Sequence, residues 1–411
     1  MSQESLIHDW NLPEDPPVDA SPKGLMLDDE TLRDGLQSPS VIDPPIAAKK
    51  KILHLMDELG IDTANVGLPG AGPRAVADVE ALCREIADQK LSLTANCAAR
   101  TMIRDIEPIV AASQSSGLAV EASLFIGSSP IRQFAEGWDE SFLLKQTTEA
   151  IRFAVGHGLP VLYVTEDTSR ARPETIRKLY GEAVRLGVKR VCVTDTVGHA
   201  TPAGVARLIR FVREVVDEAG GNDVGIDWHG HRDRGMGLIN SLAAFRAGAT
   251  RVHGCGLGIG ERCGNTELDL VMVNMKLLGW IDRDLSKLGE YCRAVSEATG
   301  VPIPSNYPVV GTDAFETATG VHAAAVIKAY RKGDDWLADR IYSGVAAGEF
   351  GARQKIRIGP MSGRSNVIFW LEQNGIESTD ERVDIIFDHA KQSDRLLRDD
   401  EILQLLGTTV S

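Results

Sequence analysis

The stretch LDDETLRDGLQSPS, residues 27–40, follows a short apolar run and places several ionisable side chains close together. Among them are Asp29, Glu30, Arg33 and Asp34. A solvated loop has such a composition, and so does the end of a barrel strand that holds a metal ion. No glycine-rich dinucleotide-binding loop follows the run, which disfavours an open, doubly wound sheet. The rest of the chain decides between these alternatives.

Strand-like apolar runs recur along the chain, with helical patterns between them. We identify eight: LMLDD (25–29), TANVGLP (63–69), LSLTANC (91–97), VEASLFIGSS (120–129), PVLYVTED (160–167), RVCVTDT (190–196), VGIDWHGH (224–231) and TRVHGCG (250–256). Alternating strands and helices predict parallel β/α units. Eight such units predict an α/β fold of the (β/α)8 TIM-barrel type, which takes about 250 residues. An open sheet is the alternative.

One predicted helix shows the quality of this signal. In TPAGVARLIRFVREVVDEAGG (201–221), Thr201 suits the N-cap, Pro202 the first turn and Gly220 the stop. The apolar residues share one helical face: Val205, Leu208, Ile209, Val212, Val215 and Val216.

Composition divides the chain into three parts. Residues 1–23 are acidic and proline-rich and predict a flexible N-terminal arm. Residues 24–280 hold the barrel pattern and form the predicted catalytic domain. Residues 281–411 are mainly helical in pattern and predict a smaller C-terminal appendage.

Charge and cysteine usage exclude several classes of protein. The 411 residues carry a net charge of −14, from 44 basic and 58 acidic side chains, which argues against a nucleic-acid or anionic-membrane partner. Six cysteines without a C-x-x-C pair indicate reduced thiols. Neither a signal peptide nor an apolar run of about 20 residues is present, so we expect a soluble, cytoplasmic protein.

Polar residues gather where the strand-like runs end. They are Arg33, Asp34, Asn65, Ser128, Ser129, Glu166, Asp167, Asp195, Thr196, His229 and His231. The carboxyl ends of barrel strands share one face, where active sites are built. We therefore expect a site at the end of the 27–40 stretch.

A metal site is one interpretation of WHGHRD. His229 and His231 are two residues apart, so their side chains point the same way on a strand. Two imidazoles with a carboxylate, for which Asp34 is the obvious candidate, suit a divalent metal. The alternative is a pair of half-buried histidines without a ligand.

Other local signals leave two interpretations open. GCGLGIGERCGNTELD (254–269) allows close approach of a ligand, with Glu261, Arg262 and Asn265 as polar contacts, but a flexible surface loop has the same composition. Cys255 and Cys263 favour small buried thiols over metal ligands.

Two further polar sites are equally open at this level. Glu166 and Asp167 are either general acid–base catalysts or residues that cap a helix. His322 lies in an apolar helical pattern, where a packing histidine is the simpler interpretation.

Six stretches in order resemble the 2-isopropylmalate, citramalate and homocitrate synthase family, within the metal-dependent Claisen synthases and acyl-CoA lyases on a TIM barrel. They are DDETLRDGLQSP, EDTSR, DTVGHATP, HGHRDRGMGLINSLAAFRAGA, GIGERCGNTELD and SGRSN, spread over residues 24–375. The resemblance implies that acetyl-CoA condenses with a 2-oxo acid chelated to a divalent cation, Mg, Mn or Zn. A 2-alkylmalate and CoA would be released.

The resemblance also implies the metal ligands. Asp34, His229 and His231 match the family's ligands, and Asn265 matches an Asn near the metal.

Further roles follow from the same resemblance. Arg33 matches the Arg that stabilises negative charge on oxygen, and Thr196 the Thr that binds the oxo-acid carboxylate. Glu166 and His322 match a pair that handles the protons of acetyl-CoA, and Tyr342 matches a helper Tyr. In the family the last two residues come from the partner chain, which implies a homodimer with swapped appendages.

Three positions bear on the substrate. Asn65 stands where the family has a Glu that pairs with the Arg matched by Arg33, so we expect Arg33 to lose its usual charge balance. Arg232 replaces the usual Asn after the His pair. Leu162 replaces the Arg by which homocitrate synthases hold a distal carboxylate, which would remain unpaired here. We therefore expect an apolar acceptor, 2-oxoisovalerate or pyruvate.

Two rival functions remain. An acyl-CoA lyase of the 3-hydroxy-3-methylglutaryl-CoA type suits RDGLQ but not GIGERCGN or SGRSN. A non-catalytic relative that binds metal or CoA is suggested by Asn65 and Arg232. Because the sequence stops at residue 411, we also expect no leucine- or isoleucine-type feedback domain.

Overall fold

The computed structural model describes residues 6–8, 22 and 24–407. The predicted arm, residues 1–23, therefore lies almost entirely outside the described part of the chain. Within that part, no helix has both the length and the apolar character needed to cross a bilayer.

The chain folds as two compact units. The first comprises the described residues up to Pro39 together with Ile61–Asp282, and the second comprises Ser40–Gly60 together with the described residues from Arg283 onward. The predicted division placed 40–60 with the barrel, whereas these residues group with the second unit.

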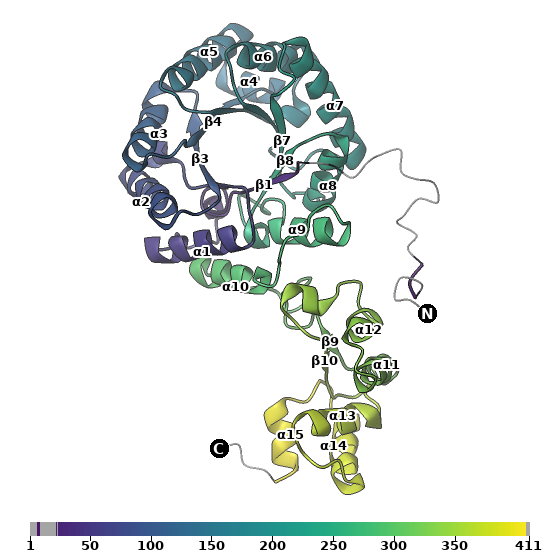
Figure 1. The fold of residues 1–411 in the computed structure, drawn as a ribbon. Helices are drawn as coiled ribbons and strands as arrows, with labels where there is room; N and C mark the ends of the chain where they lie inside the picture. The colour runs from purple at the N-terminus through teal and green to yellow at the C-terminus, as the bar shows by residue number, and fades with distance from the viewer. Residues whose placement is uncertain (1–5, 9–21, 23, 408–411) are drawn as a thin grey trace. The chain divides into compact units, whose positions relative to one another are not determined.

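The first unit is a closed barrel of eight parallel strands (Figure 1). The strands are β1 (Met26–Asp29), β2 (Thr63–Asn65), β3 (Thr94–Arg100), β4 (Glu121–Gly127), β5 (Val161–Glu166), β6 (Arg190–Asp195), β7 (Gly225–Gly230) and β8 (Arg251–Gly254). Met26 pairs with Arg251 and Asp29 with Gly254, so β1 and β8 close the barrel. The predicted TIM barrel is confirmed, and the open sheet is excluded.

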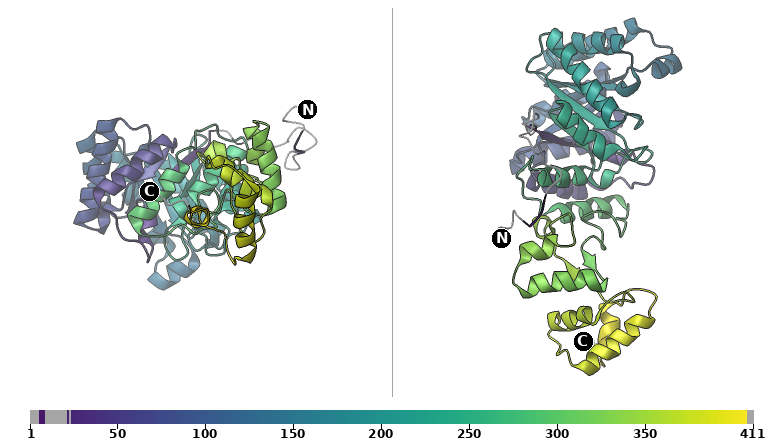
Figure 2. Two further views of the ribbon diagram at one scale, coloured as in Figure 1. Left: turned by 90° about the horizontal axis from the view of Figure 1, so that it is seen from below. Right: turned by 90° about the vertical axis from the view of Figure 1, so that its right-hand side faces the viewer.

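Helices surround these strands (Figure 1). They are α2 (Pro73–Gln89), α3 (Ile103–Ser116), α4 (Pro130–Glu136), α5 (Glu140–Gly156), α6 (Pro173–Arg185), α7 (Pro202–Glu218), α8 (Gly237–Ala247) and α9 (Leu268–Leu277). The helices between residues 140 and 218, blue to teal, lie along the outside of the barrel in the side view (Figure 2). Short 3-10 turns follow four of the strands: Gly35–Gln37, Pro69–Ala71, Thr168–Arg170 and Gly256–Gly258.

Helix α7 has the predicted limits. The Thr201 hydroxyl accepts a hydrogen bond from the backbone N–H of Gly204 at 3.3 Å, and Pro202 occupies the first turn. Gly220 has a φ of +85°, which a glycine adopts without strain and which ends the helix. The buried face holds Val205, Ile209, Val212, Val215 and Val216, while Leu208 is only half-buried.

The second unit is mainly helical, as predicted for the C-terminal part. Its helices are α1 (Ile46–Glu58), α10 (Leu288–Thr299), α11 (Gly320–Arg331), α12 (Asp335–Arg340), α13 (Arg364–Gln373), α14 (Asp380–Gln392) and α15 (Asp399–Leu405), with a short sheet of β9 (Glu316–Thr317) and β10 (Lys355–Ile356). Helix α1 packs beside α10 (Figure 1). One apolar cluster joins α13, α14 and α15 around Trp370 and Ile386, and another joins α11 and α12 around Ile327.

Candidate metal and substrate site

A cavity of about 250 Å³ lies where the barrel strands end. Its polar wall holds residues from the ends of four strands: Arg33, Asp34, Glu166, Thr196, His229 and His231. Its apolar wall holds Leu68, Ala98, Phe125, Leu162 and Val164. Parallel strands end on one side of a barrel, so side chains far apart in the chain meet here.

The predicted metal ligands are adjacent. Nε2 of His229 lies 3.1 Å from Oδ2 of Asp34, and Nε2 of His231 lies 3.5 Å from the same oxygen. One ligand atom from each of the three buried residues falls within 4.8 Å of the others. This spacing allows all three to contact a single cation.

The protonation states of this group suit a cation. Burial lowers the pKa of His231 to about 4, so this ring is neutral at neutral pH. Burial opposes ionisation of Asp34, but Arg33 and His229 outweigh it and hold its pKa well below the usual range. Contacts with Asp34 and Glu30 outweigh burial and raise the pKa of His229, so a bound cation would displace a proton from that ring.

Unsatisfied polar atoms also fit a cation. Oδ2 of Asp34 and Oδ1 of Asn265 are buried and have no hydrogen-bond partner among the described residues. The Asn265 amide nitrogen donates to the carbonyl of Ile259 at 3.2 Å, which leaves its oxygen available. Buried polar atoms are rarely left without a partner. The residues present therefore suit a divalent metal.

Glu30 is the carboxylate partner of Arg33. Nη2 of Arg33 pairs with Oε2 of Glu30, and Nη1 lies 3.3 Å from Oδ1 of Asp34. The expectation that Arg33 loses its charge balance because residue 65 is Asn is therefore wrong. The carboxylate comes from the residue that directly follows β1, and not from β2.

Asn65 does not line the cavity. Its Oδ1 accepts a hydrogen bond from the N–H of Gly67 at 3.3 Å. Its Nδ2 is buried without a partner in the described part of the chain.

His253 was not predicted as a site residue, yet it lines the cavity from β8. Its Nδ1 lies 3.2 Å from Oε1 of Glu30, and its Nε2 lies 2.9 Å from Oδ2 of Asp227. Burial opposes its protonation, but Asp28 and Asp227 raise its pKa to about 9. The ring is therefore a cation at neutral pH.

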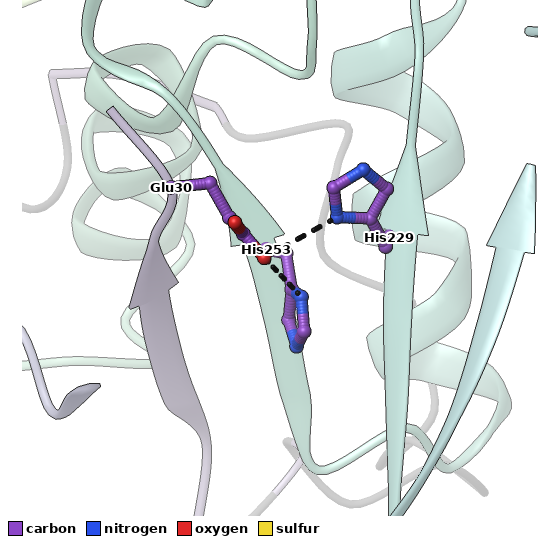
Figure 3. A group of neighbouring side chains, drawn as sticks. All are labelled: Glu30, His229 and His253. Atoms are coloured by element: carbon purple, nitrogen blue, oxygen red, sulfur yellow. Dashed lines mark hydrogen bonds and ion pairs between the residues drawn. The ribbon is translucent and has the colours of Figure 1, made fainter. Parts of the chain in front are cut away.

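Glu30, His229 and His253 form a second group with metal-like spacing (Figure 3). Figure 3 shows contacts from the Glu30 carboxylate to both rings. Both ring nitrogens of His253 already face carboxylates, so a cation there would have to displace this ring from Glu30 or Asp227. Hence the Asp34 group is the better candidate for a metal site.

Glu166 and Asp167 have different surroundings. Glu166 lines the cavity, and burial raises its pKa above the usual range although Arg132 partly offsets this. Asp167 instead pairs with Arg170, Nη2 to Oδ2 at 2.7 Å. The Thr196 hydroxyl accepts a hydrogen bond from the N–H of Asp167 at 2.8 Å. Of these two carboxylates, only Glu166 lines the cavity, whereas Asp167 is held by Arg170.

Leu162 lies on the apolar wall and is 1% exposed. It neighbours Ser123 on β4, in register. Val164 and Phe125 extend the same wall. Among the described residues that line the cavity, the only arginine or lysine is Arg33.

The glycine-rich segment 254–269 is packed closely against itself. A Cβ on Gly264, whose φ is +109°, would lie 1.9 Å from the carbonyl oxygen of Gly258. Arg262 pairs with Asp233 at 2.8 Å, and Arg232 pairs with Glu267. Arg232, which replaces the usual Asn of the family, therefore holds this segment through its ion pair with Glu267. Cys255 is buried and Cys263 exposed, and both are free thiols.

His322 and Tyr342 belong to the second unit. Their rings stack with centroids 4.2 Å apart and an interplanar angle of 28°. Both side chains are exposed, so His322 is not a buried packing histidine.

Two residues that line the cavity, Glu30 and His253, were not assigned to the site by sequence reasoning. Glu30 lies within the opening stretch, and His253 lies on the eighth apolar run. Their significance comes from contacts between strands, which no local pattern reveals.

Comparison with known proteins narrows the class to which a closed eight-stranded barrel with this cavity belongs. A family model described as HMGL-like matches residues 25–295. A homocitrate synthase of Methanopyrus kandleri is 34% identical over 383 residues, covering 92% of this chain and 90% of the relative. A probable 2-isopropylmalate synthase of the same organism is 33% identical over 374 residues, covering 90% of this chain and 70% of the relative.

Solved structures share the fold. An HMG-CoA lyase from Brucella melitensis has a TM-score of 0.55 at 18% identity, covering 66% of this chain and 98% of that chain. The chain belongs to the HMGL-like family, and its predicted resemblance to the synthase group is confirmed.

Proposed function

We propose that the protein condenses acetyl-CoA with a 2-oxo acid and releases a 2-alkylmalate and CoA. The observation that carries this proposal is the Asp34–His229–His231 group, whose ligand atoms lie within 4.8 Å of one another beside a small cavity. Sequence relatives named as homocitrate and 2-isopropylmalate synthases support the same class of reaction.

The polar wall holds and polarises the acceptor. A divalent cation, Mg, Mn or Zn, held by Asp34, His229 and His231 would act as a Lewis acid on the 2-oxo acid. Asn265, with its unpartnered oxygen, lies beside these ligands and pairs as a bridge with His231. Arg33 stabilises negative charge that develops on the acceptor's carbonyl oxygen.

The remaining groups handle the carboxylate and the protons. Thr196 binds the carboxylate of the oxo acid. Glu166 removes a proton from the acetyl methyl group, and the resulting carbanion forms a bond to the keto carbon, whose oxygen takes up a proton. Water then hydrolyses the thioester and releases CoA. His322 and Tyr342, supplied by the partner in a homodimer with swapped appendages, assist this proton transfer.

The apolar wall selects the acceptor. Because Leu162, Phe125 and Val164 offer no cation, a distal carboxylate would be buried unpaired at a cost of several kcal/mol. We therefore favour 2-oxoisovalerate, with pyruvate as the smaller alternative; the two differ by methyl groups worth about 1–3 kcal/mol each. The homocitrate synthase relative at 34% identity favours 2-oxoglutarate as a second candidate.

A thiol-release assay tests the proposal. Purified protein with acetyl-CoA and Mg or Mn is given 2-oxoisovalerate, pyruvate, 2-oxoglutarate, oxaloacetate or glyoxylate in turn. We expect CoA release to be fastest with 2-oxoisovalerate. Preference for 2-oxoglutarate would contradict the assignment of the apolar wall. No release with any acid, but cleavage of 3-hydroxy-3-methylglutaryl-CoA, would indicate a lyase. If the protein shows neither CoA release nor lyase activity, it is a relative that binds metal or CoA without catalysis.

A further inference from the structure

Glu30 sits between the metal group and the buried charges of the barrel interior. Its Oε2 pairs with Nη2 of Arg33, while its Oε1 lies 3.2 Å from Nδ1 of His253 and 3.6 Å from Nδ1 of His229. It is 2% exposed. We propose that Glu30 is the positioning residue of the metal site, a carboxylate that keeps Arg33 from occupying Asp34 and orients the His229 ring. This inference rests on the proposed metal site.

The first part of the argument concerns Asp34. Arg33 already contacts Oδ1 of Asp34 at 3.3 Å and gives its other terminal nitrogen to Glu30. Oδ2 of Asp34 makes no hydrogen bond within the described residues and stays available to a cation. Without the negative charge of Glu30, Asp34 would be the one carboxylate of this pair that still binds the Arg33 guanidinium. Arg33 would then compete directly with the metal for Asp34.

The second part concerns the His229 ring. Its Nε2 faces Asp34 at 3.1 Å, whereas its Nδ1 faces Glu30 at 3.6 Å. One ring nitrogen is therefore directed at each carboxylate. Carboxylates behind a ligating imidazole orient the ring and favour the tautomer whose other nitrogen binds metal. Glu30 is placed to do this directly after β1.

The third part concerns charge balance. The Arg33 guanidinium lies between two carboxylates, Glu30 and Asp34. Removing the negative charge of Glu30 leaves this guanidinium paired with Asp34 alone, which disfavours a divalent cation there. Removing the positive charge of Arg33 frees Asp34 from that contact, which favours one. The two changes therefore predict opposite effects on metal affinity.

Titration calorimetry of the full-length protein with Mn²⁺ alone tests the inference. We expect Glu30→Gln to weaken Mn²⁺ binding about tenfold or more, and Arg33→Gln to tighten it. A matched control is Glu121→Gln. Glu121 is another buried barrel carboxylate and pairs with Arg251 at 2.6 Å, away from the cavity wall, so its loss should leave the Mn²⁺ affinity near that of the wild type.

The opposite signs separate positioning from general damage to the fold. Equal binding by Glu30→Gln and the wild type would overturn the inference, and so would weaker or unchanged binding by Arg33→Gln. If Glu30→Gln does not fold, Arg33→Gln decides alone, because only tighter binding is compatible with the inference. Absence of Mn²⁺ binding by the wild type would instead contradict the metal site of the proposed function, so the two failures are distinguishable.

Discussion

Oε2 of Glu166, the proposed base, lies 3.9 Å from Nε of Arg132. Burial raises the pKa of Glu166 above the usual range, and Arg132 partly offsets the shift. The carboxylate is therefore a stronger base than an exposed glutamate, while remaining ionised above its raised pKa. A base that removes a proton from a thioester methyl group benefits from such a shift.

The pH dependence of kcat/KM should show this shift. Only ionised Glu166 accepts a proton, so the rate falls as pH drops through its pKa, and the acid limb should lie above the ordinary value of about 4.3. Arg132→Gln removes the offsetting cation and should move the acid limb to still higher pH. Lys145→Gln, at an exposed position of α5, is the control. An acid limb that stays in place or moves to lower pH in Arg132→Gln would contradict the role of Glu166.

Leu162→Arg should change the preferred acceptor. The substitution places a cation on the apolar wall, where it can pair with a distal carboxylate. We expect the ratio of kcat/KM for 2-oxoglutarate to that for 2-oxoisovalerate to rise by about tenfold or more, since a buried charge without a partner costs several kcal/mol. Leu162→Met keeps the wall apolar and is the control. If both variants shift the ratio equally, Leu162 does not select the acceptor through charge.

The barrel interior holds a charge network whose loss should unfold the protein more easily. Buried Arg251 bonds Glu121 at 2.6 Å and Asp227 at 2.7 Å. Arg251→Met leaves both carboxylates short of a partner, and we expect the free energy of unfolding in urea to fall by about 3–5 kcal/mol. Combining it with Glu121→Leu should recover part of the loss.

An exposed ion pair provides the comparison for that experiment. Arg331 and Glu372 lie 3.1 Å apart and are about half exposed, at 54% and 44%. Arg331→Ala should cost at most about 1 kcal/mol. A loss in Arg251→Met no larger than this would show that the interior network does not stabilise the barrel.

Mixed subunits test whether the appendage of one chain serves the barrel of another. Asp34→Ala inactivates the barrel site and His322→Ala the appendage site, so each homodimer should be inactive. Denaturing the two variants together and refolding them should yield heterodimers with one intact site, and about a quarter of wild-type activity is expected from random pairing. Continued inactivity of a mixture whose heterodimers are verified by mass would rule out sharing between subunits.

The sequence predicted the barrel because its strands are short apolar runs that end in polar residues. Thr201, Pro202 and Gly220 likewise predict α7 from local capping chemistry alone. One rule, that parallel strands end on the same face of a barrel, predicts that Asp34, His229 and His231 lie close together. That rule needs no knowledge of side-chain contacts.

Glu30 and His253 could not be found in this way. They are 223 positions apart and meet only because β1 pairs with β8 when the barrel closes. The strand register that sets their contact comes from the closed barrel and not from any local pattern. The same limit explains the wrong expectation for Arg33. That expectation considered Asn65 on β2 but not the carboxylate of Glu30, which follows the neighbouring strand β1. The grouping of α1 with α10 also depends on packing between distant segments.

The central claim is that Asp34 holds a metal on which condensation depends. The most direct measurement is CoA release from acetyl-CoA and 2-oxoisovalerate by protein stripped of metal with a chelator, before and after Mg²⁺ or Mn²⁺ is restored. We expect the metal to restore activity in the wild type, and activity in Asp34→Asn to stay more than about a hundredfold lower, beyond the effect typical of an outer-shell change. CoA release that needs no metal, or that Asp34→Asn supports at the wild-type rate, would contradict the account.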